Sequence, residues 1–333
     1  MNYRRLSRTH ERRHAQAGVS LVELMIAITL GWVAVGAAMS IFRANRKSLA
    51  LVQGLARVQE NARFAVDMIS RDLREAGGVA CGGSLIQENV VNSNEWWKNW
   101  SSGLKGYDGA TVLPAKAVGT SSGDRVAGTD ALVVWSASTA SPSTITGFSG
   151  GAGTPRTVTT FNVTPNQSLG EGYVFTACDG SRVATFTLNA NASTSVATKE
   201  VLTNDLAIGG FVNQLNASAW YIGVGSRSSS AKSLYRVVLG MSSGSPATSS
   251  QEIVENITAM TVSYLVGDGA GAPAAASTSY VGAASVLDWS KVIAARLSLT
   301  LTTQEKVGVT SSGASEVINH TVPMTVAIRR RLL

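Results

Sequence analysis

The chain has 333 residues, enough to bury a substantial core, and this length predicts one large domain. It has 28 basic and 21 acidic side chains and a net charge of +7, but residues 1–18 contain five arginines and one glutamate, which leaves 23 basic and 20 acidic residues in the rest. Because the basic excess is concentrated in this leader, the composition argues against a nucleic-acid-binding protein, and no nucleic acid is expected as a partner.

The first predicted element is an apolar helix over residues 19–42, in which Glu23 is the single charged residue. A helix of this length rises about 36 Å, enough to cross a hydrocarbon core of about 30 Å. The arginines before it are expected to keep that end in the cytoplasm. An acidic side chain inside such a segment is costly, so the sequence predicts that Glu23 has an assigned partner.

The run AGVSLVELMIAITLG resembles the N-terminal signature of type IV pilins and of the pseudopilins of type II secretion. The resemblance implies that a prepilin peptidase in the membrane cuts after Gly18 and methylates the new N-terminus, Val19. It makes Glu23 the acid at the fifth position of the mature chain. The first mature residue of this family is most often phenylalanine, whereas here it is valine. Two alternatives remain, namely an ordinary secretory signal cleaved near residues 35–37 and a permanent membrane anchor without a filament role.

The helix is predicted to continue through residues 43–77 as an amphipathic segment. Apolar residues recur there at spacings of three and four, which places them in one stripe that a sheet is expected to cover. They are Leu51, Leu55, Val58, Ala62, Ala65, Ile69 and Leu73. Gly77 and Gly78 are expected to end a single long helix over residues 20–76.

Residues 78–333 are predicted to form a β-rich globular head with long loops, which makes the chain an α+β protein of the type IV pilin kind. The predicted strands are 131–136, 158–163, 173–178, 182–188, 234–239, 260–266, 293–301 and 321–328, and the predicted loops are 137–156, 189–199, 225–233, 241–250 and 267–285. Alternation is clearest from Ile293 to Leu301, and Asp179-Gly180 predicts a hairpin turn.

The order of segments also resembles the PilW-type minor pilins. The segments that carry this resemblance are ARFAVDMISRDLREAGG, DALVVWSA, CDGSRVATFTL, LYRVVLG, QEIVENITAMTVSYLV, WSKVIAARLSLTL and TVAIRRRL. They cover most of the chain in the family's order. The J-type minor pseudopilins of type II secretion systems are the closest alternative.

Cys81 and Cys178 both follow the membrane segment, so they are expected to reach an oxidising compartment and to pair. Such a disulfide closes a long loop and stabilises the fold by about 4–5 kcal/mol in the chain-entropy model. Two separate buried thiols are the alternative.

Sequence features of catalytic and metal sites are sparse. His320 is the single histidine beyond the leader, so a histidine-based triad or zinc site is difficult to build. The Ser-x-x-Lys spacings at Ser102 and Ser229 are expected by chance in a serine-rich chain, and Asp268 alone is far short of a calcium site. No enzyme activity, cofactor or metal is expected, and a secreted enzyme or adhesin with an ordinary signal peptide is the less favoured alternative.

Trp96, Trp97 and Trp100 form an aromatic cluster in the segment after Cys81. One interpretation is a flap that covers the edge of the sheet. The other is an interface with a neighbouring subunit or tip protein, because tryptophan is favoured at binding hot spots.

The pilin resemblance implies a minor subunit that enters a type IV pilus at or near its tip and primes assembly, with twitching, adhesion or DNA uptake downstream. The implied partners are the prepilin peptidase, other minor pilins, the major pilin and a large tip adhesin. Before assembly the chain would be held in the inner membrane, with its N-terminus cytoplasmic and its head periplasmic, and afterwards it would lie in the cell-surface pilus. Glu23 would pair with the methylated amine of Val19 on a neighbouring subunit, because a low dielectric strengthens such a pair.

Overall fold

The computed structural model describes residues 18–78, 86–89, 91, 95–98, 102–138, 142–149, 158–165, 169–202, 206–268, 279–304, 308–309 and 315–328. Internal contacts divide the chain into two units, Met1–Gln53 and Gly54–Leu333. Helix α1 (Leu21–Glu75) contains the boundary between them.

In the first unit the apolar run is helical, as predicted. An 18-residue window of α1 has a mean hydropathy of 2.1, which makes the helix long and apolar enough to cross a membrane. None of the side chains in that window is buried within the structure. This part of the helix therefore presents its apolar surface in every direction, as membrane-spanning and filament-core helices do.

In the second unit α1 buries one stripe, formed by Val58, Ala62, Ala65, Ile69 and Leu73. These are the positions that the spacing of apolar residues predicted from Val58 onward. Charged residues occupy the opposite face, where Asp67 and Arg71 form an exposed ion pair of 3.7 Å one turn apart.

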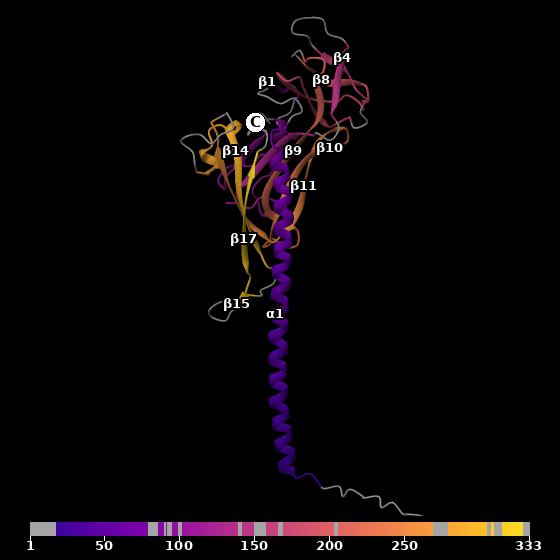
Figure 1. Cartoon of the computed structure of the whole chain (residues 1–333). Coiled ribbons are helices and arrows are strands. Elements are labelled where there is room, and N and C mark those ends of the chain that lie inside the picture. The colour runs from indigo at the N-terminus through magenta and orange to yellow at the C-terminus, as the bar shows by residue number, and fades with distance from the viewer. Residues whose placement is uncertain are drawn as a thin grey trace, which may run out of the picture. The chain divides into compact units, whose positions relative to one another are not determined.

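The head is built on two large β-sheets and one small one (Figure 1). The eleven-stranded sheet contains β1 (Ile86–Asn89), β2 (Leu104–Tyr107), β3 (Ala131–Ala137), β4 (Ser143–Phe148), β5 (Val158–Val163), β6 (Val174–Cys178), β7 (Arg182–Thr187), β8 (Ser195–Leu202), β9 (Phe211–Val224), β10 (Lys232–Ser242) and β11 (Ser245–Glu255). The four-stranded sheet has the order β13 (Val281–Gly282), β12 (Ile257–Val266), β14 (Val292–Thr302), β17 (Asn319–Ala327). The small sheet pairs β15 (Gly308–Val309) with β16 (Ser315–Glu316).

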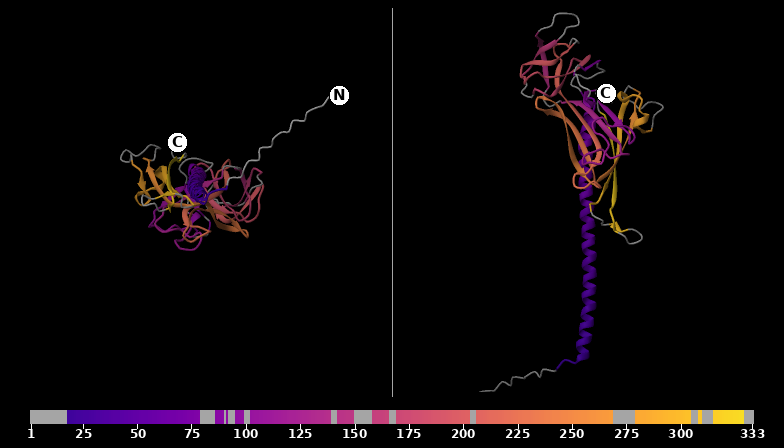
Figure 2. Two further views of the ribbon diagram at one scale, coloured as in Figure 1. Left: turned by 90° about the horizontal axis from the view of Figure 1, so that it is seen from below. Right: turned by 180° about the vertical axis from the view of Figure 1, so that it is seen from behind.

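The buried stripe of α1 packs against the inner faces of both large sheets. One continuous core joins the stripe to Leu132 of β3, Trp220 of β9 and Leu297 of β14. Figure 2 shows strands of the two sheets around the helix. The long N-terminal helix and the mainly antiparallel head confirm the predicted α+β arrangement.

Strand β9 joins the two halves of the eleven-stranded sheet. Its first residues pair with β6 and β4, and the rest pairs with β3 and β10. A second core lies on the far face of β3 and β9, and a third lies among β4 to β8. Because β9 is buried along most of its length, it lacks the apolar–polar alternation of a half-buried strand.

All eight predicted strands are present, each within a few residues of the predicted limits. Several predicted loops, however, contain strands. β4 lies inside 137–156, β8 begins inside 189–199, β11 begins inside 241–250, and β13 lies inside 267–285. These predictions were wrong because strands rich in serine, threonine and alanine are stabilised by pairing with distant neighbours, which local composition does not reveal.

Alternation in β14 is confirmed, since Ile293, Ala295, Leu297, Leu299 and Leu301 are all buried. The hairpin predicted at Asp179-Gly180 is also present, where β6 and β7 pair as antiparallel neighbours and Gly180 has φ of +92°.

The C-terminal end of α1 is fixed to β3 by backbone contacts. The Gly77 N–H donates to the Trp135 carbonyl at 2.8 Å, and the Ala137 N–H donates to the Gly78 carbonyl at 2.6 Å. Gly77 has φ of +69° and lies against Gly103. A Cβ atom added to Gly103 would lie 2.2 Å from the Cα atom of Gly77. Two glycines are therefore required where the helix meets the sheet.

Gly103→Ala is expected to lower the free energy of unfolding by about 2–4 kcal/mol, because the added methyl group meets backbone and φ is +65°. Thermal and denaturant unfolding of the full chain would measure this. Gly147→Ala is the matched control, since its nearest atom is Asn162 Nδ2 at 3.7 Å and a change within about 0.5 kcal/mol is expected. Equal effects of the two substitutions would contradict the close packing inferred here.

Tyr221 on β9 joins three parts of the head through its hydroxyl group. The hydroxyl lies 2.8 Å from the Gly123 carbonyl and 2.8 Å from Ser250 Oγ on β11, and the ring stacks on Tyr235. Burial raises the pKa of Tyr221 to about 12.

This raised pKa predicts a loss of stability in alkali. Below pH about 10 the phenol is neutral in both states, whereas between pH about 10 and about 12 it ionises in the unfolded chain and stays protonated in the fold. The free energy of unfolding should therefore fall across this range, by up to about 1.4 kcal/mol per pH unit for this group. Tyr221→Phe should make the fall shallower, and an unchanged slope in denaturant titrations at several pH values would refute the assignment.

Candidate functional site

The N-terminal segment contains the three residues that the sequence singled out for processing and assembly. Gly18 and Val19 are exposed and precede the helix, and Val19 is 71% exposed. Glu23 lies in the first turn of α1. The bond between Gly18 and Val19 therefore lies in non-helical, exposed backbone, which is the form that proteases act on.

Glu23 is the lone acid of the apolar run and is exposed within its unit. In the first turn its carboxylate lies near the unpaired backbone N–H groups and the positive end of the helix dipole, which favour a negative charge. Nothing else between Ser20 and Phe42 carries a charge, so in an apolar environment a cation from another molecule would be the natural counter-ion.

The predicted disulfide falls partly outside the described residues. Cys178 is buried at the end of β6, whereas Cys81 lies outside the residues that the structure describes. The pairing of these two cysteines therefore stays a prediction.

The tryptophan cluster lies against the second core of the head. Trp97 is 2% exposed, and its carbonyl accepts a hydrogen bond of 3.1 Å from the Trp135 indole. Trp96 is partly buried, with its ring centroid 6.4 Å from that of Trp135, and Trp100 lies outside the described residues. Trp97 thus packs over the sheet, and a partner interface at this cluster stays a prediction.

A polar cluster around Asp72 fixes the last turns of α1 to the eleven-stranded sheet. The Asp72 Oδ2 atom accepts hydrogen bonds of 2.8 Å from Ser218 Oγ and 2.8 Å from Trp220 Nε1, both on β9. Arg236 on β10 donates to both carboxylate oxygens, at 3.1 and 2.9 Å. The Asp72 side chain is only 13% exposed, so this bidentate ion pair is largely desolvated.

Sequence reasoning missed the Asp72 cluster. Asp72 lies among charged residues of an amphipathic helix, where an aspartate is expected to face solvent. Its partners lie more than 140 positions away in the sequence, and two of them, Ser218 and Trp220, belong to β9, which is not among the strands that the sequence predicted. No local signal distinguishes it from Asp67.

Arg125 is a second residue whose role the sequence did not indicate. It is 1% exposed, and its guanidinium donates to the carbonyls of Thr111 at 2.7 Å and Asp108 at 2.8 Å, and to that of Thr129. Burial lowers the pKa of Arg125, while the nearby Asp130 carboxylate opposes this effect. The side chain therefore holds the long segment between β2 and β3 in place.

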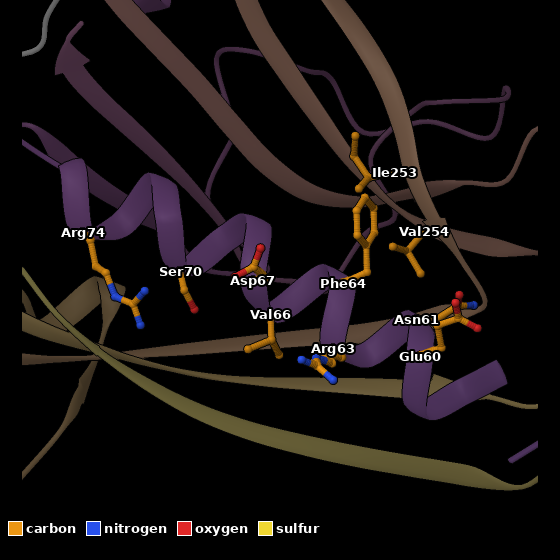
Figure 3. A pocket seen from close by; sticks show the side chains of 10 residues that line it. All are labelled: Glu60, Asn61, Arg63, Phe64, Val66, Asp67, Ser70, Arg74, Ile253 and Val254. Carbon is orange, nitrogen blue, oxygen red and sulfur yellow. The ribbon is translucent and has the colours of Figure 1, made fainter. Parts of the chain in front are cut away.

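Among the described residues, no group of three or more His, Cys, Asp or Glu side chains could hold a metal ion. A groove of about 760 Å³ runs along the exposed face of α1 in the second unit (Figure 3). It is lined by Glu60, Asn61, Arg63, Phe64, Val66, Asp67, Ser70, Arg74, Ile253 and Val254. Such a groove, with one exposed aromatic ring among charged groups, is typical of contacts between proteins.

Part of the chain matches a known protein family. Residues 219–333 match the family model of the type IV pilus-assembly protein W, PilW. This segment begins within β9 and continues through β10, β11 and the four-stranded sheet. No curated protein and no solved structure matches the chain.

Asp72→Asn is expected to lower the free energy of unfolding by roughly 2–4 kcal/mol, because it leaves the Arg236 charge without its counter-ion in a partly desolvated site. Asp67→Asn is the matched control on the same helix, where the pair with Arg71 is exposed and a change below about 0.5 kcal/mol is expected. Denaturant unfolding measures the stability of both variants. Equal losses would show that the ion pair of Asp72 contributes no more to stability than the exposed pair of Asp67.

Proposed function

From the PilW match over residues 219–333, which supports a PilW-type protein related to type IV pili, we propose that this chain is a minor pilin. The observation that carries the proposal is one acidic side chain, Glu23, in the first turn of an apolar helix of membrane-spanning length. The family match supports a pilus rather than an unrelated membrane anchor.

The first step of the proposed function is processing by prepilin peptidase. The precursor is anchored in the inner membrane by α1, with its leader in the cytoplasm and its head in the periplasm. The peptidase hydrolyses the bond between Gly18 and Val19 and methylates the Val19 amine. The exposed, non-helical backbone at this bond supports the proposal. The chain is the substrate of this chemistry and performs no catalysis of its own.

The second step is docking of the mature helix within a bundle of apolar helices. The carboxylate of Glu23 pairs there with the positively charged, methylated amine of Val19 on a neighbouring subunit. A low dielectric strengthens and orients this pair, and an unpaired Glu23 would be costly in the same place. The apolar side chains of α1 supply the remaining adhesion.

The third step is incorporation at or near the filament tip, together with other minor pilins, where the complex primes growth of the major pilin and holds a large adhesin. Long segments between strands support this placement, because repeated packing along a shaft would be obstructed by them. An even distribution of the protein along purified filaments would contradict it.

Mass spectrometry of the native N-terminus tests the first step. The mature chain should begin at methylated Val19. A chain that begins near Ala38 would lack the apolar helix, and the protein would then be an ordinary exported protein. Loss of protein secretion rather than of twitching in a deletion strain would assign the chain to a type II secretion system instead.

Glu23→Ala should leave cleavage after Gly18 largely intact and abolish incorporation into sheared filaments, because the apolar bundle would lose its counter-charge for the Val19 amine. Glu75→Ala, which removes an exposed carboxylate from the last residue of the same helix, should enter filaments normally. Immunoblots of the filament fraction and of the membranes measure both effects. Normal incorporation of the Glu23→Ala variant would remove the pairing mechanism.

A further inference from the structure

The exposed face of α1 in the second unit lies beside two strands, each with one unpaired edge. β11 pairs with β10 alone, and β17 pairs with β14 alone, among the strands that the structure describes. β17 carries Pro323 in its middle, which removes one hydrogen-bond donor and limits further pairing. β11 has its single proline, Pro246, at its second position, and it contains no lysine or arginine. Proline therefore interrupts β17 in its middle, whereas β11 offers an unbroken run of backbone N–H groups from Ala247 to Glu255.

A β-bulge shapes the C-terminal end of β11. Leu234 of β10 pairs with Val254, whereas the next residue, Tyr235, pairs with Glu252, so Ile253 is the extra residue. A bulge changes the direction of side chains and bends the strand. As a result, two successive apolar residues, Ile253 and Val254, both line the groove beside α1.

Phe64 lies opposite these two residues. Figure 3 shows its ring pointing from α1 toward Ile253. Phe64 is 52% exposed, although it belongs to a helix whose other exposed residues in this groove are charged. Together, Phe64, Ile253 and Val254 form an apolar notch, with the carboxylates of Glu60 and Asp67 among the groove residues around it.

The chemistry of an unpaired strand edge selects its partner. Backbone N–H and C=O groups alternate along the edge, and an extended peptide is the element that satisfies them in order. An added strand beside β11 would continue the sheet toward the exposed face of α1. It would lie over the notch, where one apolar side chain of the added strand can cover Phe64.

We infer that the outer edge of β11 pairs with an extended strand of a neighbouring pilus subunit, which places an apolar side chain over Phe64 and Ile253. The inference rests on the proposed function, since it names a contact by which the head joins the assembly. A second copy of this chain suits the edge less well. In an antiparallel self-pair centred on Ser250, Pro246 would stand opposite Val254 and offer no N–H there.

Photo-crosslinking of the full chain in the cells that produce it tests the contact. A photoreactive amino acid is placed at Phe64 and, separately, at Ser249 of β11. A third placement at Leu287, which is 99% exposed between β13 and β14, is the control. The inference is supported when Phe64 in the groove and Ser249 on the strand edge both attach to one strand from another processed pilus subunit, and the control does not. Adducts to a second copy of this chain, to a helix, or to no subunit would overturn it.

Two proline variants separate pairing at the edge from folding of the head. Successive N–H groups of an antiparallel strand point to opposite sides, so of Thr248 and Ser249 one donates toward β10 and the other points outward. The outward variant, Thr248→Pro or Ser249→Pro, should keep its melting temperature and lose the adducts. The inward variant should be less stable. Loss of adducts only when stability is lost would contradict strand addition.

Substitution of the notch residue gives a second readout. Phe64→Ala should lower the amount of chain in sheared filaments at least tenfold, because truncating an interface hot spot weakens binding by more than this factor. Leu287→Ala should have no effect. If Glu23→Ala is excluded from filaments while Phe64→Ala and both proline variants enter normally, the inference fails and the proposed function stands. If the unaltered chain never enters filaments, the proposed function itself fails.

Discussion

The head is organised by the need to bury one stripe of α1. Val58, Ala62, Ala65, Ile69 and Leu73 form an apolar surface on a helix whose opposite face is charged. A single sheet can cover only part of the surface of a helix. Here strands from both large sheets form a common core around the stripe. Because hydrophobic burial is roughly proportional to area, this contact supplies the main attraction between helix and head.

Hydrophobic burial has no strong directional preference, so it does not by itself fix the rotation of the helix. The Asp72 carboxylate supplies direction, since it accepts hydrogen bonds from two strands and lies in a bidentate pair with Arg236. Buried polar groups are costly when they lack partners, and a rotated helix would leave both charges unpaired. The apolar stripe therefore provides affinity, and the carboxylate selects one orientation.

Features with a local physical signal were predictable from the sequence. The stripe on α1, the alternation of β14 and the turn at Asp179-Gly180 each follow from spacing or from the backbone freedom of glycine. The roles assigned to Gly18, Val19 and Glu23 also come from the sequence alone, and they stay predictions. Strand β9 was not predictable, because burial on both faces removes alternation and polar residues such as Asn213 and Ser218 interrupt it. Arg125 and Asp72 gain their roles from partners that only the fold brings near.

The place of Asp72 along the helix has a mechanical consequence. If the chain is pulled through its N-terminal end, the stripe detaches gradually, starting at Val58 and moving toward Leu73. The ion pair between Asp72 and Arg236 breaks late in that order, and the backbone hydrogen bonds of Gly77 and Gly78 to β3 break last. Partial detachment would therefore leave the head attached to the helix through these polar contacts. The helix would then pack against both sheets again once the tension ceased.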